Sequence, residues 1–455
     1  MSRQSALVWL MILLGGFASM LWSLRASRPG DARVPAIQAV LYVAEGTPPQ
    51  PPDPAAATPV LVYLLPPRPE VAGLAAQLDN VNPAGARSFA RNHQEMAILL
   101  PNFNDVIGAD KLASGRMPVA GANEVLAGAA AEHQDQLDLE GRAYQVVGTL
   151  GRDDPLPAKA YVLPDHPAHR ARLDAADPSV KQGYLLFRVK DGRPGENSQF
   201  PKEHFTAVAG SERLDRGTYY AYVAGMVLLV AGGSALLIGG YCQAAKRVTN
   251  RWLALPLAEL ANRKRLLVTL HLAYFGLWAA GTLVIYETPI VQDFLMQAVH
   301  KEIETGAGPL RVAGEAYKSG SVARAAGTTL AINFFLGSVL MITLPSLVIP
   351  GAGILVALFR ALAWGILLAP IGMLMAGAML PHAWTLLLEG EGYVLATFFA
   401  VLVPVYLFRP DPGATIGSRY RRALAVNLKG NLLVLAVLAA AALYEAIEVI
   451  WQMTG

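Results

Sequence analysis

The chain has 455 residues, of which 54% are hydrophobic and 16% are charged, and its formal net charge is +3. A soluble globular domain carries roughly 25% charged residues, so this composition excludes an ordinary soluble protein and favours an integral membrane protein. The sequence has no basic cluster that would indicate nucleic-acid binding. Cys242 is its single cysteine, which excludes an intrachain disulfide framework. The phosphate-binding GxxxxGK[ST] loop is absent from the sequence. Any ATP-driven step would therefore need another subunit.

Seven stretches are long and apolar enough to cross the hydrocarbon core as helices, which takes about 20 residues. In chain order they are 6–24, 217–242, 266–286, 328–349, 354–378, 386–408 and 430–450. The connections 243–265 and 409–429 are rich in lysine and arginine, which the positive-inside rule assigns to the cytoplasm. The alternation of spans then predicts an inner N-terminus, with 25–216 and 287–327 outside, in a bacterial cytoplasmic membrane.

The first apolar stretch, 6–24, has two interpretations. Its basic start and short apolar core (MSRQSALVWLMILLGGFASM) fit a cleavable signal sequence. No convincing A-x-A cleavage site follows, which favours a retained membrane anchor over residues 1–24.

Residues 25–216 form a polar insert with strand and helix signals of its own. The proline-rich run GTPPQPPDPAAATP predicts an exposed loop. Strands are predicted at 59–65, 123–128, 142–150 and 159–164, and helices at 69–79 and 127–136. The insert is therefore expected to be a mixed α+β domain. Asp165, His166 and His169 are interpreted as a solvated loop, because a fourth metal ligand is missing.

One segment of the insert, 105–154, carries a series of short motifs. They are Gly115-Arg116, Pro118, Glu124-Val125, Gly128, Gly141-Arg142 and Val146-Val147-Gly148. In this order they resemble the periplasmic core domain of macrolide-exporter-type (MacB-like) permeases. The resemblance implies an extracytoplasmic core domain between an N-terminal anchor and a second span. Those permeases continue with two further spans, whereas five follow here.

The second span carries glycines at a regular interval. Gly225, Gly232 and Gly239 lie seven residues apart, on one helix face that would let another helix approach closely. The stripe fits packing within the chain or a dimer seam.

The basic segment 243–265 (with KRVTNRWLALPLAELANRKR) predicts an elbow helix at the inner surface. Arg251, Trp252 and Arg263 are its candidate contacts to a nucleotide-binding partner. Alternatively, the basic residues of this segment only set the membrane topology, and Trp252 lies at the membrane interface.

Further along, an apolar stripe that includes Ile290 and Phe294 predicts an amphipathic helix, which would lie on the outer membrane surface or pack against the insert.

Residues 266–455 contain several ordered landmarks. They are Asn333 in AINFFLG, the PGAG turn at 350–353, Leu380-Pro381-His382, and LYEAIEVI at 443–450. These landmarks resemble the stage II sporulation protein M family, which implies a five-helix membrane domain. The family usually has glycine after the histidine and glutamate four residues beyond it, where this chain has Ala383 and Leu386. Arg360 stands where an asparagine is common.

Ionisable side chains inside these apolar stretches mark candidate functional positions. Pro381 lacks an amide proton and is predicted to break the fifth span from the sixth, with His382 satisfying a freed carbonyl. Glu389 lies two helical turns beyond His382 on the same face, so the two side chains could bind a proton, face a polar cleft or reach the outer headgroups.

Three more ionisable residues lie in the last spans. Arg360 is expected to snorkel to the inner surface, or else to pair with Glu259 or with a partner subunit. Glu445 and Glu448 share one face of the last helix, which must point at protein, water or the outer interface.

The two resemblances imply two alternative functions, one for the MacB-like segment and one for the block that resembles stage II sporulation protein M. The first is a non-catalytic, permease-like or mechanotransmission subunit of an ABC-exporter-type assembly, energised by a separate ATPase. The second is a membrane scaffold that recruits envelope or peptidoglycan-remodelling proteins. An enzyme is not expected, since no nucleophile or metal set accompanies His382 and Glu389, and no cofactor is expected either. A homo-oligomer is compatible with both functions.

Overall fold

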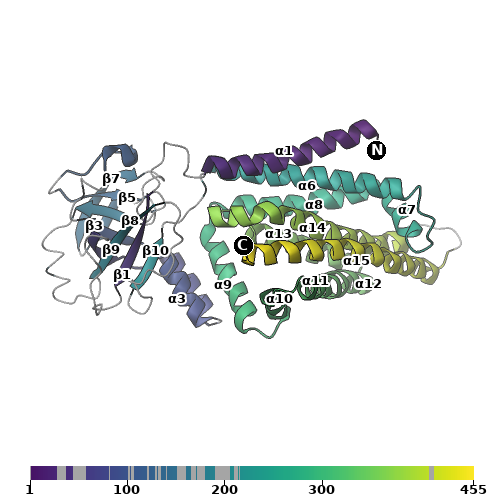
Figure 1. Ribbon diagram of the computed structural model, residues 1–455. Helices are drawn as coiled ribbons and strands as arrows, with labels where there is room; N and C mark the ends of the chain where they lie inside the picture. The colour runs from purple at the N-terminus through teal and green to yellow at the C-terminus, as the bar shows by residue number, and fades with distance from the viewer. Residues whose placement is uncertain are drawn as a thin grey trace. The chain divides into compact units, whose positions relative to one another are not determined.

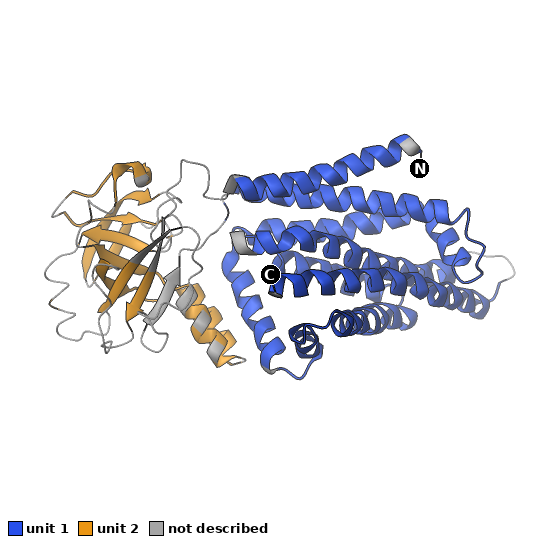
Figure 2. Ribbon diagram, in the orientation of Figure 1, with its two compact units in different colours: residues 1–27, 213–455 blue, residues 28–212 orange. Residues whose placement is uncertain are grey.

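The computed structural model divides the chain into two compact units, shown in Figure 2. Unit 1 comprises Met1–Ser27 and Arg213–Gly455, and unit 2 comprises Arg28–Glu212. The predicted segments 217–265 and 266–455 thus belong to one unit, together with the first helix. The structure describes residues 2–27, 37–44, 58–80, 82–100, 103, 107–119, 122–128, 131, 135–139, 141–150, 160–164, 171, 180–189, 205–209, 214, 216–408 and 414–454.

Unit 1 is helical (Figure 1). Its helices are α1 (Arg3–Ser27), α6 (Arg216–Ala244), α7 (Ala254–Asn262), α8 (Lys264–Ile285), α9 (Pro289–Thr305), α10 (Pro309–Lys318), α11 (Val322–Ala331), the π-helical η2 (Ile332–Thr343), α12 (Leu344–Val348), α13 (Ala352–Leu367), α14 (Met373–Phe408) and α15 (Ile416–Thr454). Among the described residues, six helical segments are long and apolar enough to cross a membrane: Gln4–Arg25, Arg216–Ala244, Lys264–Ile285, Val322–Val348, Met375–Phe408 and Ile416–Met453. The apolar α13 has 16 residues, about 24 Å of helix, and is shorter than a usual span.

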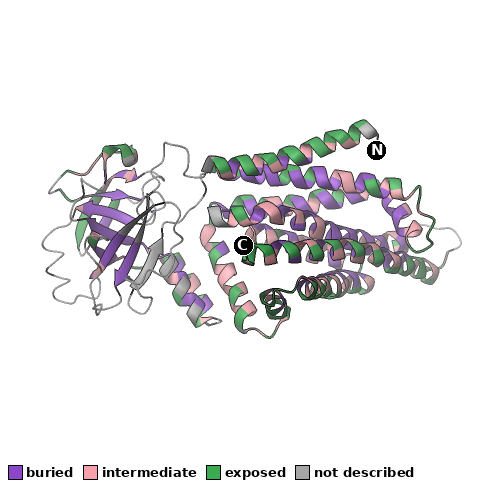
Figure 3. Ribbon diagram, in the orientation of Figure 1, coloured by how far each residue is buried: buried purple, intermediate pink, exposed green. Residues whose placement is uncertain are grey.

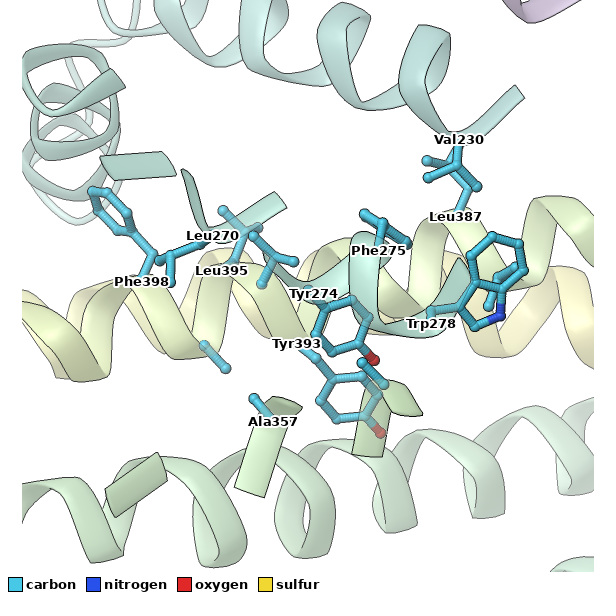
Figure 4. Packing of buried hydrophobic residues seen from close by; sticks show 14 of the residues in the cluster. Val230, Leu270, Tyr274, Phe275, Trp278, Ala357, Leu387, Tyr393, Leu395 and Phe398 are labelled. Atoms are coloured by element: carbon cyan, nitrogen blue, oxygen red, sulfur yellow. The ribbon is translucent and has the colours of Figure 1, made fainter. Parts of the chain in front are cut away.

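Helix α14 is the centre of unit 1. Of its most apolar window, 72% is buried, against 28% for α1 and 33% for α15. Figure 4 shows part of the core around it, where Tyr393, Leu395 and Phe398 of α14 meet residues of α8 such as Tyr274. A polar group on α14 is therefore surrounded by other helices.

The predicted helix break at Pro381 is wrong. Helix α14 continues through Pro381, and the break between α13 and α14 lies at 368–372, around Pro370. Two side chains of α15 donate hydrogen bonds to backbone oxygens around Pro381: the Tyr444 hydroxyl to Pro381 O (3.1 Å) and Gln452 Nε2 to Ala378 O (3.4 Å). The proline removes the partner of the Gly377 carbonyl, four residues earlier, so these two hydrogen bonds do not replace the lost one, but they attach α15 to the same turn of α14.

The glycine stripe of α6 packs against α1 within the chain. A Cβ added at Gly225 would lie 2.7 Å from the Gly16 carbonyl oxygen, and one added at Gly232 would lie 2.7 Å from the Leu13 amide nitrogen. Only a residue without a side chain lets the two backbones approach this closely. At Gly225 and Gly232 the structure thus shows packing within the chain, the first of the two interpretations of the stripe.

Unit 2 is built on one ten-stranded sheet, with the order β10-β1-β9-β2-β3-β8-β5-β7-β4 and with β6 paired to β7. The strands are β1 (Ile37–Ala44), β2 (Thr58–Leu64), β3 (Met96–Leu100), β4 (Leu112–Gly115), β5 (Glu124–Ala127), β6 (Gln136–Leu139), β7 (Arg142–Leu150), β8 (Ala160–Pro164), β9 (Val180–Val189) and β10 (Phe205–Ala209). Helices α2 (Pro69–Asp79) and α3 (Pro83–Asn92) and the 3-10 turn η1 (Ala109–Lys111) connect some of them.

The sheet of unit 2 buries both faces. Val60 and Val62 of β2 belong to one apolar cluster, while Leu61 and Tyr63, which alternate with them, belong to another. Strand β3 is buried at all five positions, and Figure 3 shows the central strands in the colour of buried residues. This alternation is expected of a sheet whose successive side chains point to opposite faces.

The predicted strands at 59–65, 123–128, 142–150 and 159–164 and the helix at 69–79 are confirmed as β2, β5, β7, β8 and α2. The helix predicted over 127–136 is wrong at its ends, since Ala127 ends β5 and Gln136 begins β6, and of the residues between them the structure describes only 128, 131 and 135, none of them helical. The proline-rich loop at 46–57 and the segment with Asp165, His166 and His169 lie outside the described residues.

The motifs of 105–154 have a structural explanation. Arg116, directly after β4, forms an ion pair with Glu124 at the start of β5 (Nη1 to Oε2, 2.8 Å), and the Val119 amide donates to the same carboxylate oxygen at 2.8 Å. Gly141, with φ of +77°, forms the turn between β6 and β7. The Gly-Arg-x-Pro and Glu-Val motifs thus join the ends of β4 and β5, the two strands that flank β7.

Candidate functional site

An ion pair lies halfway along α13 and α14. Arg360 Nη2 lies 3.0 Å from Glu389 Oε1 and, in a longer contact, 3.5 Å from Asn333 Oδ1 of η2. The guanidinium carbon lies 4.1 Å from the ring centre of Tyr393 and 5.6 Å from that of Trp364. The positive charge of Arg360 is therefore stabilised by one carboxylate and by two aromatic rings. Glu389 is about 24 Å along the axis from Met373 at the start of α14, since each residue adds about 1.5 Å.

Close helix packing sets the position of Arg360. A Cβ added at Gly281 of α8 would lie 2.8 Å from the Leu362 carbonyl oxygen, and the Thr282 hydroxyl donates to the Gly365 carbonyl at 3.0 Å. These contacts press α13 against α8 and leave Arg360 facing α14. The π-helical η2 brings Asn333 to the same place, and π-helical turns occur often at functional sites.

A second charged group joins α14 to α15. His382 Nδ1 lies 3.2 Å and 3.3 Å from the two carboxylate oxygens of Glu448. The Thr385 hydroxyl and the Gln452 amide also donate to this carboxylate, each at 2.9 Å. Glu448 is 6% exposed, so these donors replace the water that a carboxylate would otherwise bind.

A cavity of about 240 Å³ lies between these two groups. Its ionisable lining residues are His382 and Glu389 of α14 and Glu445 of α15. Tyr274 of α8 and Trp364 of α13 form aromatic walls, and Leu368 and Leu386 form apolar ones. The cavity therefore combines acidic, aromatic and aliphatic surface.

Glu445 differs from the other carboxylates of the site. No salt bridge to it occurs among the described residues, whereas Glu389 pairs with Arg360 and Glu448 with His382. The Tyr317 hydroxyl of α10 lies close enough to interact with the Glu445 carboxylate, and it also forms a 3.0 Å hydrogen bond with the Thr329 hydroxyl. Among the described residues, Glu445 is thus the carboxylate of the cavity that forms no salt bridge, although His382 lines the same cavity.

The structure brings the predicted polar residues together but changes some partners. The snorkelling of Arg360 is wrong, because its side chain is 22% exposed and binds Glu389. Its alternative partner Glu259 binds Arg263 at 2.9 Å and accepts from the Tyr406 hydroxyl at 2.7 Å. His382 and Glu389 line one cavity, yet each binds a different helix.

Sequence reasoning missed a further pair, His271 of α8 and Glu391 of α14. His271 Nε2 lies 2.7 Å from Glu391 Oε2, and His271 Nδ1 lies 2.8 Å from the Leu267 carbonyl oxygen. The carbonyl only accepts, so Nδ1 carries a proton and a second proton lies between Nε2 and the carboxyl group. Glu391 is 0% and His271 5% exposed. The sequence signal that could have identified this pair was the presence of a histidine and a glutamate inside apolar stretches.

The predicted elbow forms α7 and the turn before it. Trp252 is 45% exposed and lies between two cations, the Arg251 guanidinium at 5.9 Å and Lys429 Nζ at 5.6 Å from the ring centre. Arg263 is held by Glu259 and lies 5.5 Å from the Tyr406 ring centre. Arg251 and Trp252 are therefore accessible, while Arg263 serves the packing of α7.

The predicted amphipathic helix is α9. Gln292, which is buried, donates hydrogen bonds to the Leu367 and Ala369 carbonyls at 3.0 Å and 2.9 Å. Helix α9 thus covers the break between α13 and α14, beside the cavity residue Leu368.

Comparisons of the chain with protein-family models, with curated proteins and with solved structures found no match.

Proposed function

We propose that the chain is an integral membrane protein of the bacterial cytoplasmic membrane and acts as a non-catalytic, permease-like subunit that a separate ATPase energises. Six helices have the length and apolarity of membrane spans, and we take α13 as a shorter seventh crossing. In this arrangement α7 and the basic segments face the cytoplasm, and unit 2 lies on the other side of the membrane.

The observation that carries the proposal is the charged cavity beside the Arg360–Glu389 pair, a pair that lies midway along α13 and α14. A charged side chain at the centre of a bilayer costs about 2.5–3.5 kcal/mol on insertion scales, so such residues mark pathways and coupling sites by default. Arg360, Glu389 and Glu445 would be expensive as mere packing residues. A cavity between them gives a reason for their presence.

The contact to the ATPase is assigned to the accessible part of the elbow, Arg251 and Trp252. The chain has no phosphate-binding loop of its own, so nucleotide hydrolysis would occur on the partner. Movement would then pass from α7 through Tyr406, which binds Glu259 of α7, into α14.

The test is affinity purification of the full-length protein from membranes of its own host in mild detergent. We expect a subunit with a nucleotide-binding motif to be recovered, and we expect Arg251→Glu combined with Trp252→Ala to reduce that recovery. Arg311→Glu is the matched control, because Arg311 is an exposed arginine whose partner is its own helix residue Glu315. Absence of any nucleotide-binding subunit, with unchanged membrane ATPase activity in a deletion strain, would refute the proposal.

A scaffold that recruits envelope proteins is the second candidate. The contacts of Glu448 and Tyr444 clamp α15 to α14 without needing any ligand, which suits a rigid platform. Glu389→Gln separates the two functions. It should lower the ATPase activity of a coupled assembly without altering expression, but leave the recovery of scaffolded partners unchanged.

A further inference from the structure

The charges around the cavity do not balance. Arg360 is matched by Glu389 at 3.0 Å, and His382 faces Glu448 at 3.2 Å. Glu445 has the Tyr317 hydroxyl and His382 as neighbours, but no salt bridge to it occurs in the part of the chain that the structure describes. In an apolar surrounding the lost hydration of such a carboxylate is compensated either by uptake of a proton or by a counter-charge, and a cationic ligand would supply the second.

The walls of the cavity indicate which kind of cation fits. Tyr274 and Trp364 present aromatic rings, and the Trp364 ring already lies 5.6 Å from one guanidinium. Leu386 adds aliphatic surface. Aromatic rings attract organic ammonium ions, whose positive charge is surrounded by apolar groups. A metal ion instead needs several oxygen or nitrogen ligands. No group of three or more metal-ligating side chains occurs among the described residues.

The volume sets an upper size. At about 240 Å³ the cavity is smaller than the roughly 300–1,000 Å³ of sites for drug-sized molecules. It fits a small amine and excludes a macrocycle.

We propose that this cavity binds a small organic cation, a primary or quaternary amine, with the Glu445 carboxylate as counter-ion and with Trp364 and Tyr274 as its aromatic walls. The inference rests on the proposed permease-like function in that it names the ligand class of the same site. The binding itself does not depend on the ATPase. Glu389 remains with Arg360, so a single carboxylate is available to a single positive charge.

The test is isothermal titration of the full-length protein, in nanodiscs of zwitterionic lipid, with tetramethylammonium chloride. We expect saturable binding that sodium chloride does not compete away. Glu445→Gln, which keeps the shape of the side chain, and Trp364→Leu should each weaken binding by about tenfold or more, since each removes one of the two attractions. Glu315→Gln, on the exposed surface of α10, is the matched control and should bind as the unchanged protein does. Tetrabutylammonium should bind more weakly because of its size.

Three results would overturn the inference: no binding by monodisperse wild-type protein, equal binding by the Glu445→Gln variant, or full competition by sodium. Glu445→Gln removes a charge without creating a cavity, so this arm remains interpretable if the Trp364 variant does not fold. Amine binding without a recovered ATPase would refute the proposed function alone, and a recovered ATPase without amine binding would refute this inference alone.

Discussion

Two carboxylates of α14 lie two residues apart and have opposite surroundings. Glu389 faces α13 and the cavity, is 18% exposed and binds a guanidinium. Glu391 faces α8, is 0% exposed, binds His271 and does not line this cavity. The first pair is accessible to a ligand, while the second is closed on all sides. We therefore assign binding to the Glu389 side and cohesion of α8 with α14 to the Glu391 side.

The strongest test of this contrast removes His271. His271→Ala leaves the fully buried Glu391 without its partner, and breaking a buried pair in this way costs about 3–5 kcal/mol. We expect a large drop in the thermal midpoint of the purified protein, measured by tryptophan fluorescence. The double change His271→Leu with Glu391→Leu should recover most of the loss, because no charge is then left alone. Equal losses in the single and double variants would contradict the assignment.

Removing Arg360 should destabilise the protein less than removing His271. Arg360→Ala leaves Glu389 without a cation, but Glu389 is partly exposed and can be hydrated from the cavity, so we expect a loss of about 1–2 kcal/mol. The same thermal measurement checks this. The control, Arg311→Ala, removes an exposed pair and should stay within about 0.5 kcal/mol of the wild type. A loss as large as that of His271→Ala would mean that both faces of α14 are equally closed.

A neutral contact gives a smaller effect. Tyr444→Phe removes the donor to the Pro381 carbonyl at 3.1 Å and should cost about 1 kcal/mol, the usual net value of a hydrogen bond. Hydrogen exchange of the backbone should then rise in α14 around Pro381 but not around Glu391. Uniform exchange along α14 would show that the Tyr444 hydrogen bond does not stabilise this turn of α14.

The smallest effect is expected for the surface pair of unit 2, and it depends on pH. Hydrogen bonds from Arg116 and from the Val119 amide lower the pKa of Glu124 from 4.5 to about 2. A lowered pKa stabilises the fold above pH 4.5, and this contribution is lost as the pH falls toward 2. Exchange protection of residues 112–127 in the full-length protein, corrected for intrinsic rates, should thus be lower at pH 3 than at pH 6. Glu124→Gln should remove the difference, and a difference that persists would point to another group.

The sequence predicted the helices far better than their partners. Long apolar runs locate α1, α6, α8 and α15 because the bilayer requires about 20 such residues. The same criterion failed at Pro370, where apolar residues continue on both sides of the break and hide it. Pro381 was assigned the break because the local rule weighs only the missing amide and the ring clash, and not the packing of the other helices around α14.

The candidate site shows the same limit. The intramembrane polar residues were recognisable one by one, since ionisable groups in apolar runs are rare. The pairing of Arg360 with Glu389 depends on how α13 packs on α8 and α14, which no local pattern encodes. The partners His271 and Glu391 are 120 residues apart, so neither could be assigned from the sequence around it.

The hydrogen bonds from α15 to the turn of α14 around Pro381 restrict how unit 1 could move. Side chains of α15 bind backbone oxygens of α14, and the carboxylate of Glu448 binds His382, so these two walls of the cavity are joined. A motion that opened or closed the cavity would then have to move α13 together with α8, on which α13 packs. The hinge for that motion would be the short connection at Pro370, to which α9 is attached by the hydrogen bond from Gln292 to the Ala369 carbonyl.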